Sequence, residues 1–512
     1  MTEIELDDAV LTEASTEPAQ SRLGRQLGRL AKQSAIYGLG SMVSRLLAVL
    51  LIPLYTSYVS AGDYGRIELL MSVMAVVVVV VRGGANFGFI RFYFVDKDPE
   101  YRGRLVRTVF WAQMTYSTLA LALCVLFAPQ IADGLGVAYQ PGAGLQGSGT
   151  SLVIATAVLL WANVNYAQMT NLFRAEQRSV AFSIATLTNI GITVPLTVIL
   201  VVVYKEGPLG IIVGNLSGTL LVYLALLGYR REQLGLQFDR HLLHQVNRFG
   251  LPLMAAGLAM WVTNFGDRFM LSKLLHGPYR LTELGQYSLA YKISSAMVLL
   301  FTAFQVAWPA FAYSIEDEDE AKRAYSYILT YLMFVAAWAA VGLSLFAPWI
   351  VRLLGKKPDY WPAANAIPAL AYSSVFFAGF IVVTIATGRL RQTKFNWIAA
   401  TAAAIFNFAL NLWLIPAYGM LGAAYATLAG YVLLMLVRTW HAQQIYRVHY
   451  QWRRVASILL AAGALTGIGE ALPSSIPAAL GLTLAFPFLL ATLGFYLPAE
   501  RKRLRRLLPA AH

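Results

Sequence analysis

Long apolar stretches, separated by short turns that contain glycine or proline, recur along most of the chain. A helix of about 20 apolar residues is long enough to cross a bilayer. No gap between the stretches is long enough for a soluble catalytic domain of about 100 residues. The pattern predicts fourteen transmembrane helices, at residues 33–59, 67–92, 105–130, 151–173, 180–203, 208–229, 248–275, 284–313, 325–347, 364–387, 395–415, 420–440, 454–472 and 478–497.

The composition indicates a membrane protein and excludes a soluble enzyme with an ordinary surface. Of the 512 residues, 58% are hydrophobic and 13% are charged, and the mean hydropathy is +0.58. Soluble domains are about half apolar and about a quarter charged. The single cysteine, Cys124, excludes a disulfide framework, and the six histidines lack metal-ligand spacing. We therefore expect no metal and no cofactor.

The basic residues predict how the chain is oriented in the membrane. The formal net charge is +14, which in so apolar a chain indicates an anionic membrane surface rather than a nucleic acid. With the N-terminus placed inside, 29 of the 40 Lys and Arg residues fall in inside tails and loops, and eight fall in outside loops. Cytoplasmic loops carry an excess of Lys and Arg, so an even number of spans with both termini in the cytoplasm is favoured.

An internal repeat predicts two lobes of like topology. A Gly-x-x-Gly motif with a further glycine eight residues later begins at Gly207 and again at Gly419, an offset of 212. A second pair of motifs, ending at Gly65 and Gly285, is offset by 220. The expected fold is therefore an all-α integral membrane protein of about fourteen helices, with two six-helix lobes in parallel repeat plus two C-terminal helices.

The expected domains follow from these spans. They are a disordered acidic and then basic cytoplasmic N-terminus at 1–30, an N-terminal six-helix lobe at 31–240, a C-terminal six-helix lobe at 241–445, two additional transmembrane helices at 446–500, and a basic cytoplasmic tail at 501–512.

Three basic residues, Arg45, Arg82 and Lys292, lie near the middle of predicted spans. An ionisable residue deep in a span is costly and points to function. The acidic residues nearby, Glu68 and Asp267, are expected near span ends and not beside these cations. We predict a cationic cavity that binds a phosphate or pyrophosphate, because Arg offers a fixed fork of donors to phosphate oxygens. The alternative is that the cations pair locally with acids or reach the membrane surface.

Polar residues on the same helical faces are expected to line this cavity. The neighbours Asp267 and Arg268, at the outer end of the seventh span, are instead predicted to act as a gate or a structural pair. The cavity-lining candidates are Tyr37, Ser41, Asn86, Asn163, Asn171, Arg174, Ser288 and Ser295.

Several motifs in a fixed order carry a family resemblance. They are Ser34-Ala-Ile-Tyr37-Gly-Leu-Gly40, Leu51-Ile-Pro53-Leu54, Gly62-Asp63-Tyr64-Gly65, Gly84 with Arg91, Asp267-Arg268-Phe-Met-Leu271, and Leu284-Gly285 leading to Lys292. Along nearly the whole chain the series resembles polysaccharide flippases of the multidrug/oligosaccharidyl-lipid/polysaccharide exporter superfamily, in the Wzx-like branch. The resemblance implies a two-lobed helical fold and an alternating-access cycle that moves a lipid-linked sugar from the cytoplasmic to the outer leaflet.

The expected function is that of a flippase and not of an enzyme. Its substrate would be an undecaprenyl-(pyro)phosphate-linked oligosaccharide, moved across the bacterial cytoplasmic (inner) membrane for O-antigen, capsule or exopolysaccharide assembly. Membrane lipids are expected partners, polysaccharide assembly enzymes are further candidates, and a monomer is expected because two lobes already enclose a cavity.

Two alternatives stay open. A multidrug cation antiporter of the same superfamily would share the fold, but it needs an acidic residue at mid-membrane depth. A polytopic membrane enzyme acting on lipid-linked sugars would need a sizeable extramembrane loop with catalytic side chains.

Overall fold

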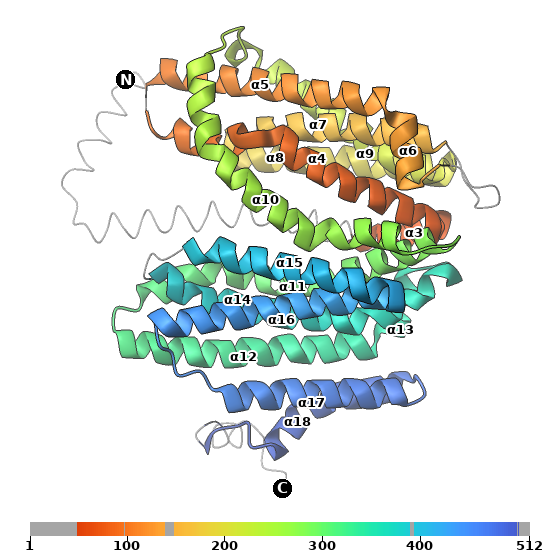
Figure 1. The fold of residues 1–512 in the computed structure, drawn as a ribbon, viewed down its shortest axis with the longest axis vertical. Coiled ribbons are helices and arrows are strands. Elements are labelled where there is room, and N and C mark those ends of the chain that lie inside the picture. Colours follow the sequence, from red (N-terminus) through yellow and green to blue (C-terminus); the bar gives the residue numbers. More distant parts are fainter. Residues whose placement is uncertain (1–48, 97, 139–147, 390–393, 499, 501–512) are drawn as a thin grey trace.

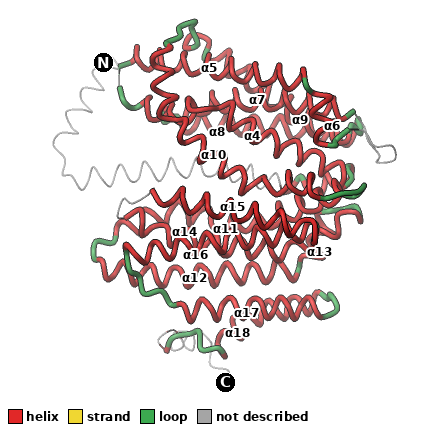
Figure 2. Tube along the Cα trace, in the orientation of Figure 1, coloured by secondary structure: helices red, strands yellow, loops and turns green. Residues whose placement is uncertain are grey.

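The computed structural model describes residues 49–96, 98–138, 148–389, 394–498 and 500, and this part of the chain is built of helices joined by short loops (Figure 2). The first half contains α3 (Ile52–Tyr58), α4 (Ala61–Tyr93), α5 (Pro99–Leu126), α6 (Ala128–Leu135), α7 (Gly149–Ala175), α8 (Ser179–Val198), the π-helix η1 (Ile199–Val203), α9 (Gly207–Tyr229) and the short η2 (Arg231–Gln233). The second half contains α10 (Arg240–Leu274), α11 (Arg280–Ser314), α12 (Glu318–Leu345), α13 (Ala347–Leu354), η3 (Pro358–Ala366), α14 (Ile367–Arg389), α15 (Lys394–Tyr418), α16 (Met420–Ile445), α17 (Trp452–Ala471) and α18 (Ile476–Thr492).

The expected all-helical membrane fold is confirmed, although the count of fourteen spans is not. Among the described residues, ten helices are long and apolar enough to cross a membrane. The predicted spans from 67–92 onward each coincide with a helix, whereas most of 33–59 lies outside the described residues. The last predicted span corresponds to α18, a shorter apolar helix.

The helices form two bundles, one above the other in Figure 1. The first contains α4, α5, α7, α8 and α9, and the second contains α11, α12, α14, α15 and α16. Helix α10 lies between them and packs against both α4 and α15 (Figure 1). Helices α17 and α18 flank the second bundle, with α17 against α12.

The glycine motifs of the repeat occupy equivalent places in the two bundles. Gly207 and Gly419 both have positive φ, 53° and 58°, a conformation that glycine adopts without steric cost, and each precedes or opens a helix. Gly218 of α9 packs against Thr193 of α8, and Gly430 of α16 packs against Asn407 of α15. The absence of a side chain allows the helices of each pair to pack closely.

The hydrophobic cores show where the two bundles meet. One core contains residues of both bundles, including Leu69 and Ile212 of the first and Leu284 and Ala423 of the second. Away from this end the cores are separate, because one cluster contains residues of the second bundle with α17 and α18, and others contain residues of the first bundle and α10. We call the joined end, formed by α3, α13, η3 and the first turns of α4 and α11, the closed end.

Candidate functional site

A partly buried ion pair joins the two bundles just inside the closed end. Lys292 of α11 donates from Nζ to Oε1 of Glu68 of α4 at 2.6 Å and to the hydroxyl of Tyr64 at 2.6 Å. Tyr64 and Glu68 are four residues apart and therefore face the same side of α4. The Glu68 side chain is 11% exposed, whereas that of Lys292 is 38% exposed, so the cation keeps access to its surroundings.

Arg268 of α10 adds a second cation to Glu68. Its Nε lies 3.5 Å from Oε2 of Glu68, and Nη1 donates to the carbonyl of Asn264 at 2.9 Å. The guanidinium also lies over the ring of Tyr291, 4.4 Å from its centroid. One carboxylate therefore pairs with cations from two helices and leaves the cluster with a net positive charge, and removing it would leave both cations unpaired in a poorly solvated site.

Asp267, the neighbour of Arg268, points to a different set of partners. Its carboxylate is fully buried and accepts hydrogen bonds from Tyr287 of α11 at 2.7 Å, Asn411 of α15 at 2.9 Å and Thr427 of α16 at 2.8 Å. These partners are neutral, so the acid stabilises the second bundle through hydrogen bonds. Asp267 and Arg268 therefore have separate partners. Arg268 contacts Glu68, and Asp267 accepts hydrogen bonds from neutral side chains.

A close backbone contact holds the closed end together. A Cβ atom on Gly65 of α4 would overlap the carbonyl of Leu281 of α11, and one on Gly285 would overlap the carbonyl of Ala61. These four residues form two pairs related by the repeat offset of 220, so the contact is symmetric. Asp359 of η3 reinforces it by accepting from the backbone N–H of Ala61 at 2.7 Å.

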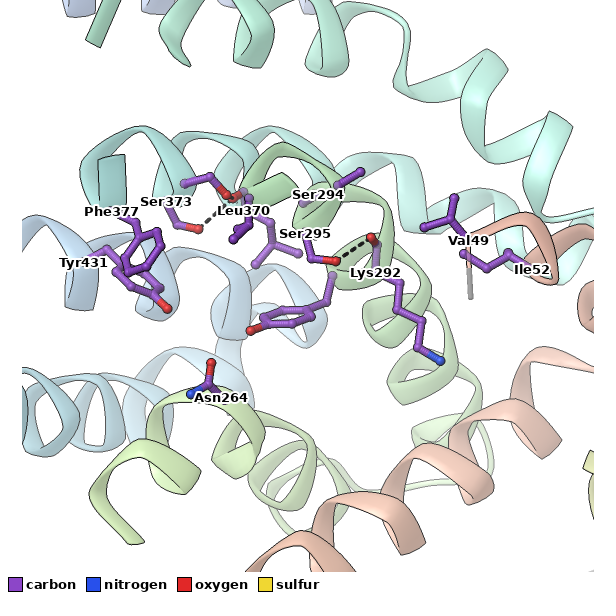
Figure 3. A pocket seen from close by; sticks show the side chains of 14 residues that line it. Val49, Ile52, Asn264, Lys292, Ser294, Ser295, Leu370, Ser373, Phe377 and Tyr431 are labelled. Atoms are coloured by element: carbon purple, nitrogen blue, oxygen red, sulfur yellow. Dashed lines mark hydrogen bonds between the residues drawn. The ribbon is translucent and has the colours of Figure 1, made fainter. Parts of the chain in front are cut away.

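A cavity of about 400 Å³ lies beside the ion pair, between α3, α10, α11, α14 and α16. Figure 3 shows Lys292 on one side of it and Tyr431, Phe377 and Ser373 on the other. Its lining consists of Lys292 with neutral residues: Val49, Ile52, Asn264, Tyr291, Ser294, Ser295, Ala296, Val298, Leu370, Ser373, Ser374, Phe377 and Tyr431. An apolar and aromatic wall with a few polar groups is typical of small-molecule sites.

Two of the predicted site residues, Lys292 and Ser295, line this cavity together. The hydroxyl of Ser295 donates to the carbonyl of Lys292 at 2.7 Å. Ser288 is fully buried one turn earlier in α11 and is not among the lining residues, and within the described part of the chain its Oγ has no hydrogen-bond partner.

Two other predicted cations, Arg82 and Arg174, are not among the residues that line this cavity. Arg82 is half-buried on α4, 14 residues after Glu68 and therefore about 21 Å further along the helix. The charged group that acts on it is Arg174 of α7, which donates to Asn171 at 3.3 Å, while Asn163 of the same helix is exposed. Arg82 and Lys292 thus do not meet at one point in this conformation, contrary to the single clamp predicted from the sequence.

Arg45, Tyr37 and Ser41 lie outside the described residues, and so does the side chain of Asn86 on α4. Arg82 on the same helix precedes a break, because Gly83 has a non-helical φ of 51°.

The expectation that no acid lies beside the membrane-embedded cations is wrong for Lys292. Glu68 contacts Lys292 because α4 and α11 cross near the closed end, which the sequence spacing within either helix does not reveal. The spacing Tyr64-x-x-x-Glu68 was the available signal, since it places an acid and a hydroxyl on one helical face. Sequence reasoning also missed the aromatic side of the cavity, Tyr291, Phe377 and Tyr431.

Two bundles of long apolar helices, joined at one end by charged and glycine contacts beside a mostly apolar cavity, define a polytopic membrane protein of the flippase and transporter class. The family model described as polysaccharide biosynthesis protein matches residues 58–357, more than half of the chain. The chain belongs to this family.

Known proteins extend this assignment. The lipid III flippase of Escherichia coli is 24% identical over 421 residues, which cover 77% of this chain and 92% of that protein. An uncharacterized membrane protein of Methanocaldococcus jannaschii is 25% identical over 218 residues, and the match spans 41% of each chain.

Solved structures share the fold. The lipid II flippase MurJ in an inward closed conformation has a TM-score of 0.69 at 16% identity, covering 90% of this chain and 98% of that one. A multidrug resistance MATE family transporter in an inward-facing conformation has a TM-score of 0.59 at 16% identity, covering 84% and 96%.

Proposed function

We propose that the protein is a flippase that moves an undecaprenyl-(pyro)phosphate-linked oligosaccharide across the cytoplasmic membrane for assembly of a cell-surface polysaccharide such as O-antigen, capsule or exopolysaccharide. The observation that carries the proposal is the cavity beside the ion pair that joins the two bundles, with the partly exposed side chain of Lys292 at one edge and neutral polar and aromatic groups along the rest. A cation in a sheltered site attracts a phosphate, and neutral polar groups suit a sugar. The name of the Escherichia coli relative, a lipid III flippase, supports the same substrate class.

The direction of transport follows from the predicted topology. In the predicted positive-inside orientation the closed end lies on the outer side of the membrane, so this conformation would be closed toward the outside. Glu68, shared by Lys292 and Arg268, is part of that seal. The two bundles would rock about the cavity, separate at the closed end and release the sugar into the outer leaflet.

Arg82 and Lys292 would then act in sequence and not as one clamp. Arg82 lies nearer the cytoplasmic end of α4 under the predicted topology, close to the second cation Arg174. An incoming pyrophosphate would meet this pair first and reach Lys292 deeper in the cavity. We propose this order because Arg82 lies about 21 Å along α4 from Glu68, the partner of Lys292.

The test uses sealed proteoliposomes. A fluorescent undecaprenyl-pyrophosphate oligosaccharide is incorporated, and its exchange between leaflets is followed with a membrane-impermeant quencher. Wild type should exchange it quickly, and Arg82→Gln should slow exchange about tenfold or more, because a charge-assisted contact to phosphate is worth about 1.5–3 kcal/mol. Arg104→Gln, an exposed arginine on α5, is the matched control and should behave as wild type. No exchange by folded wild type across several glycans would contradict the proposal.

A multidrug cation antiporter is the second candidate, and one observation favours it. Asp267 is a fully buried carboxylate among helices of the second bundle, and an antiporter of this superfamily needs such an acid. Drug resistance on overexpression, dependent on a sodium or proton gradient and lost in Asp267→Asn, would support this function. Glycan exchange without such resistance would exclude it.

A further inference from the structure

We infer that the sugar of the cargo is recognised by the second bundle alone, on an aromatic platform formed by Tyr291, Phe377 and Tyr431. The inference rests on the proposed function and assigns the part of the cavity that Lys292 does not occupy. Figure 3 shows Phe377 and Tyr431 on the side of the cavity opposite Lys292. A lipid-linked sugar has a charged phosphate next to an uncharged ring, and the cavity presents matching surfaces in the same order.

Each ring of the platform packs against another ring or a cation. The rings of Phe377 and Tyr431 meet edge to face, with centroids 5.7 Å apart and planes at 71°. Arg268 covers one face of Tyr291 at 4.4 Å, so only the other face is left for a ligand. Rings held in this way lose little conformational entropy on binding, which favours recognition of a flat apolar face such as that of a pyranose.

Hydroxyl groups around the rings complement the edge of a sugar. Ser294 is one of the lining residues, and its buried Oγ has no hydrogen-bond partner within the described residues. Ser373 donates to the carbonyl of Leu370 at 2.6 Å, which leaves its oxygen as an acceptor toward the cavity. An uncommitted buried hydroxyl costs free energy unless a ligand satisfies it, and sugar hydroxyls can both donate and accept.

The first bundle does not carry the corresponding rings. At the repeat offset of 212, Tyr431 corresponds to Thr219, and at the offset of 220, Tyr291 corresponds to Met71. Asn163 and Asn171 of α7, which the sequence suggested as cavity-lining residues, are not among the residues that line this cavity. The aromatic surface is therefore specific to the second bundle, and we assign sugar selectivity to it.

Binding to the detergent-purified full chain tests the assignment. The two probes are farnesyl pyrophosphate with N-acetylglucosamine attached and farnesyl pyrophosphate alone, and dissociation constants are measured by microscale thermophoresis. Wild type should bind the glycosylated probe about tenfold more tightly, a difference that corresponds to about 1.4 kcal/mol. Tyr431→Leu should abolish this preference and leave binding of the bare carrier unchanged, whereas Lys292→Gln should weaken both probes.

Controls separate loss of recognition from loss of folding. Tyr431→Phe keeps the ring and should keep most of the preference, and Tyr425→Leu removes an exposed tyrosine from the same helix and should change nothing. A wild-type preference that survives in both Tyr431→Leu and Phe377→Leu would overturn the assignment, and so would a wild type without any preference.

The outcome is independent of the transport test. If wild type prefers the glycosylated probe through Tyr431 but does not exchange lipid-linked oligosaccharide between leaflets, the flippase proposal fails and the sugar site stands. If exchange occurs at the same rate in wild type and Tyr431→Leu and the binding preference is unchanged, the flippase proposal stands and the sugar site fails.

Discussion

At the closed end the two bundles share a symmetric backbone contact but carry different side chains. Gly65 packs on the carbonyl of Leu281, and its repeat partner Gly285 packs on the carbonyl of Ala61. One turn further into each helix the symmetry ends. The first bundle has Glu68 where the second has Ser288.

The difference continues at the next turn and in the cavity. The second bundle has Lys292 where the first has Ser72, and Tyr431 where the first has Thr219. Small residues are retained where two backbones touch, because any side chain would separate the helices. At each of these positions only one bundle carries the charged or aromatic residue, Glu68 in the first bundle and Lys292 and Tyr431 in the second, as suits the asymmetric substrate that we propose. The repeat thus accounts for the symmetric backbone contact, and the positions that depart from the repeat form the proposed site.

The largest effect is expected from breaking the symmetric contact. Gly65→Ala places a Cβ atom on the carbonyl of Leu281 and should cost about 3 kcal/mol of stability, because the backbones must separate. Thermal unfolding followed by tryptophan fluorescence measures the loss. Gly285→Ala should have a similar effect by symmetry, while Gly103→Ala, where a Cβ meets open space, should be neutral. Equal midpoints for Gly65→Ala and Gly103→Ala would contradict the account.

Removing the asymmetric carboxylate should come next. Glu68→Gln leaves Lys292 and Arg268 without their acid and should cost about 2–3 kcal/mol, somewhat reduced because Lys292 is partly solvated. The repeat supplies the control, since Ser288→Ala removes a buried hydroxyl that has no partner among the described residues and should change stability by less than about 0.5 kcal/mol. If Ser288→Ala proves as costly as Glu68→Gln in the same unfolding assay, the ion pair is not what distinguishes the bundles.

A smaller effect is expected from Asp267→Asn. The amide keeps the shape of the carboxylate but offers one oxygen to donors from Tyr287, Asn411 and Thr427, so about 1–2 kcal/mol should be lost. Limited proteolysis of the purified chain should show the destabilisation in the second bundle, with fragments of α4 to α9 protected as in wild type. Uniform loss of protection in both bundles would show that Asp267 has a wider role than its contacts suggest.

The sequence predicts the fold far better than it predicts the site. Apolar stretches locate α4 to α17 because a bilayer demands long helices, and paired glycine motifs reveal the repeat. Lys292 stands out for the same reason, since a cation in an apolar helix is rare. Its partner Glu68 belongs to a helix more than 200 residues earlier, and only the crossing of α4 and α11 brings them together.

The aromatic side of the cavity could not be predicted from the types of residue that form it. Tyrosine and phenylalanine are common in membrane helices and pack against lipid as readily as they line a cavity. Tyr291, Phe377 and Tyr431 lie on three helices and give no local pattern. For Arg82 the sequence was misleading in another way. Its depth within its own span suggested that it lies near Lys292, but Lys292 contacts Glu68, which is 14 residues away from Arg82 along α4.

A reversible crosslink across the closed end tests the central claim that this end must open for cargo to leave. Gly62 of α4 and Thr282 of α11 are repeat partners, and a Cβ atom on Gly62 would lie 3.3 Å from Oγ1 of Thr282. The double variant Gly62→Cys and Thr282→Cys, in a Cys124→Ser background, should form a disulfide on oxidation. Oxidised protein in proteoliposomes should not exchange lipid-linked oligosaccharide between leaflets, and reduction should restore exchange. Exchange at the same rate in the oxidised, crosslinked protein would contradict the account.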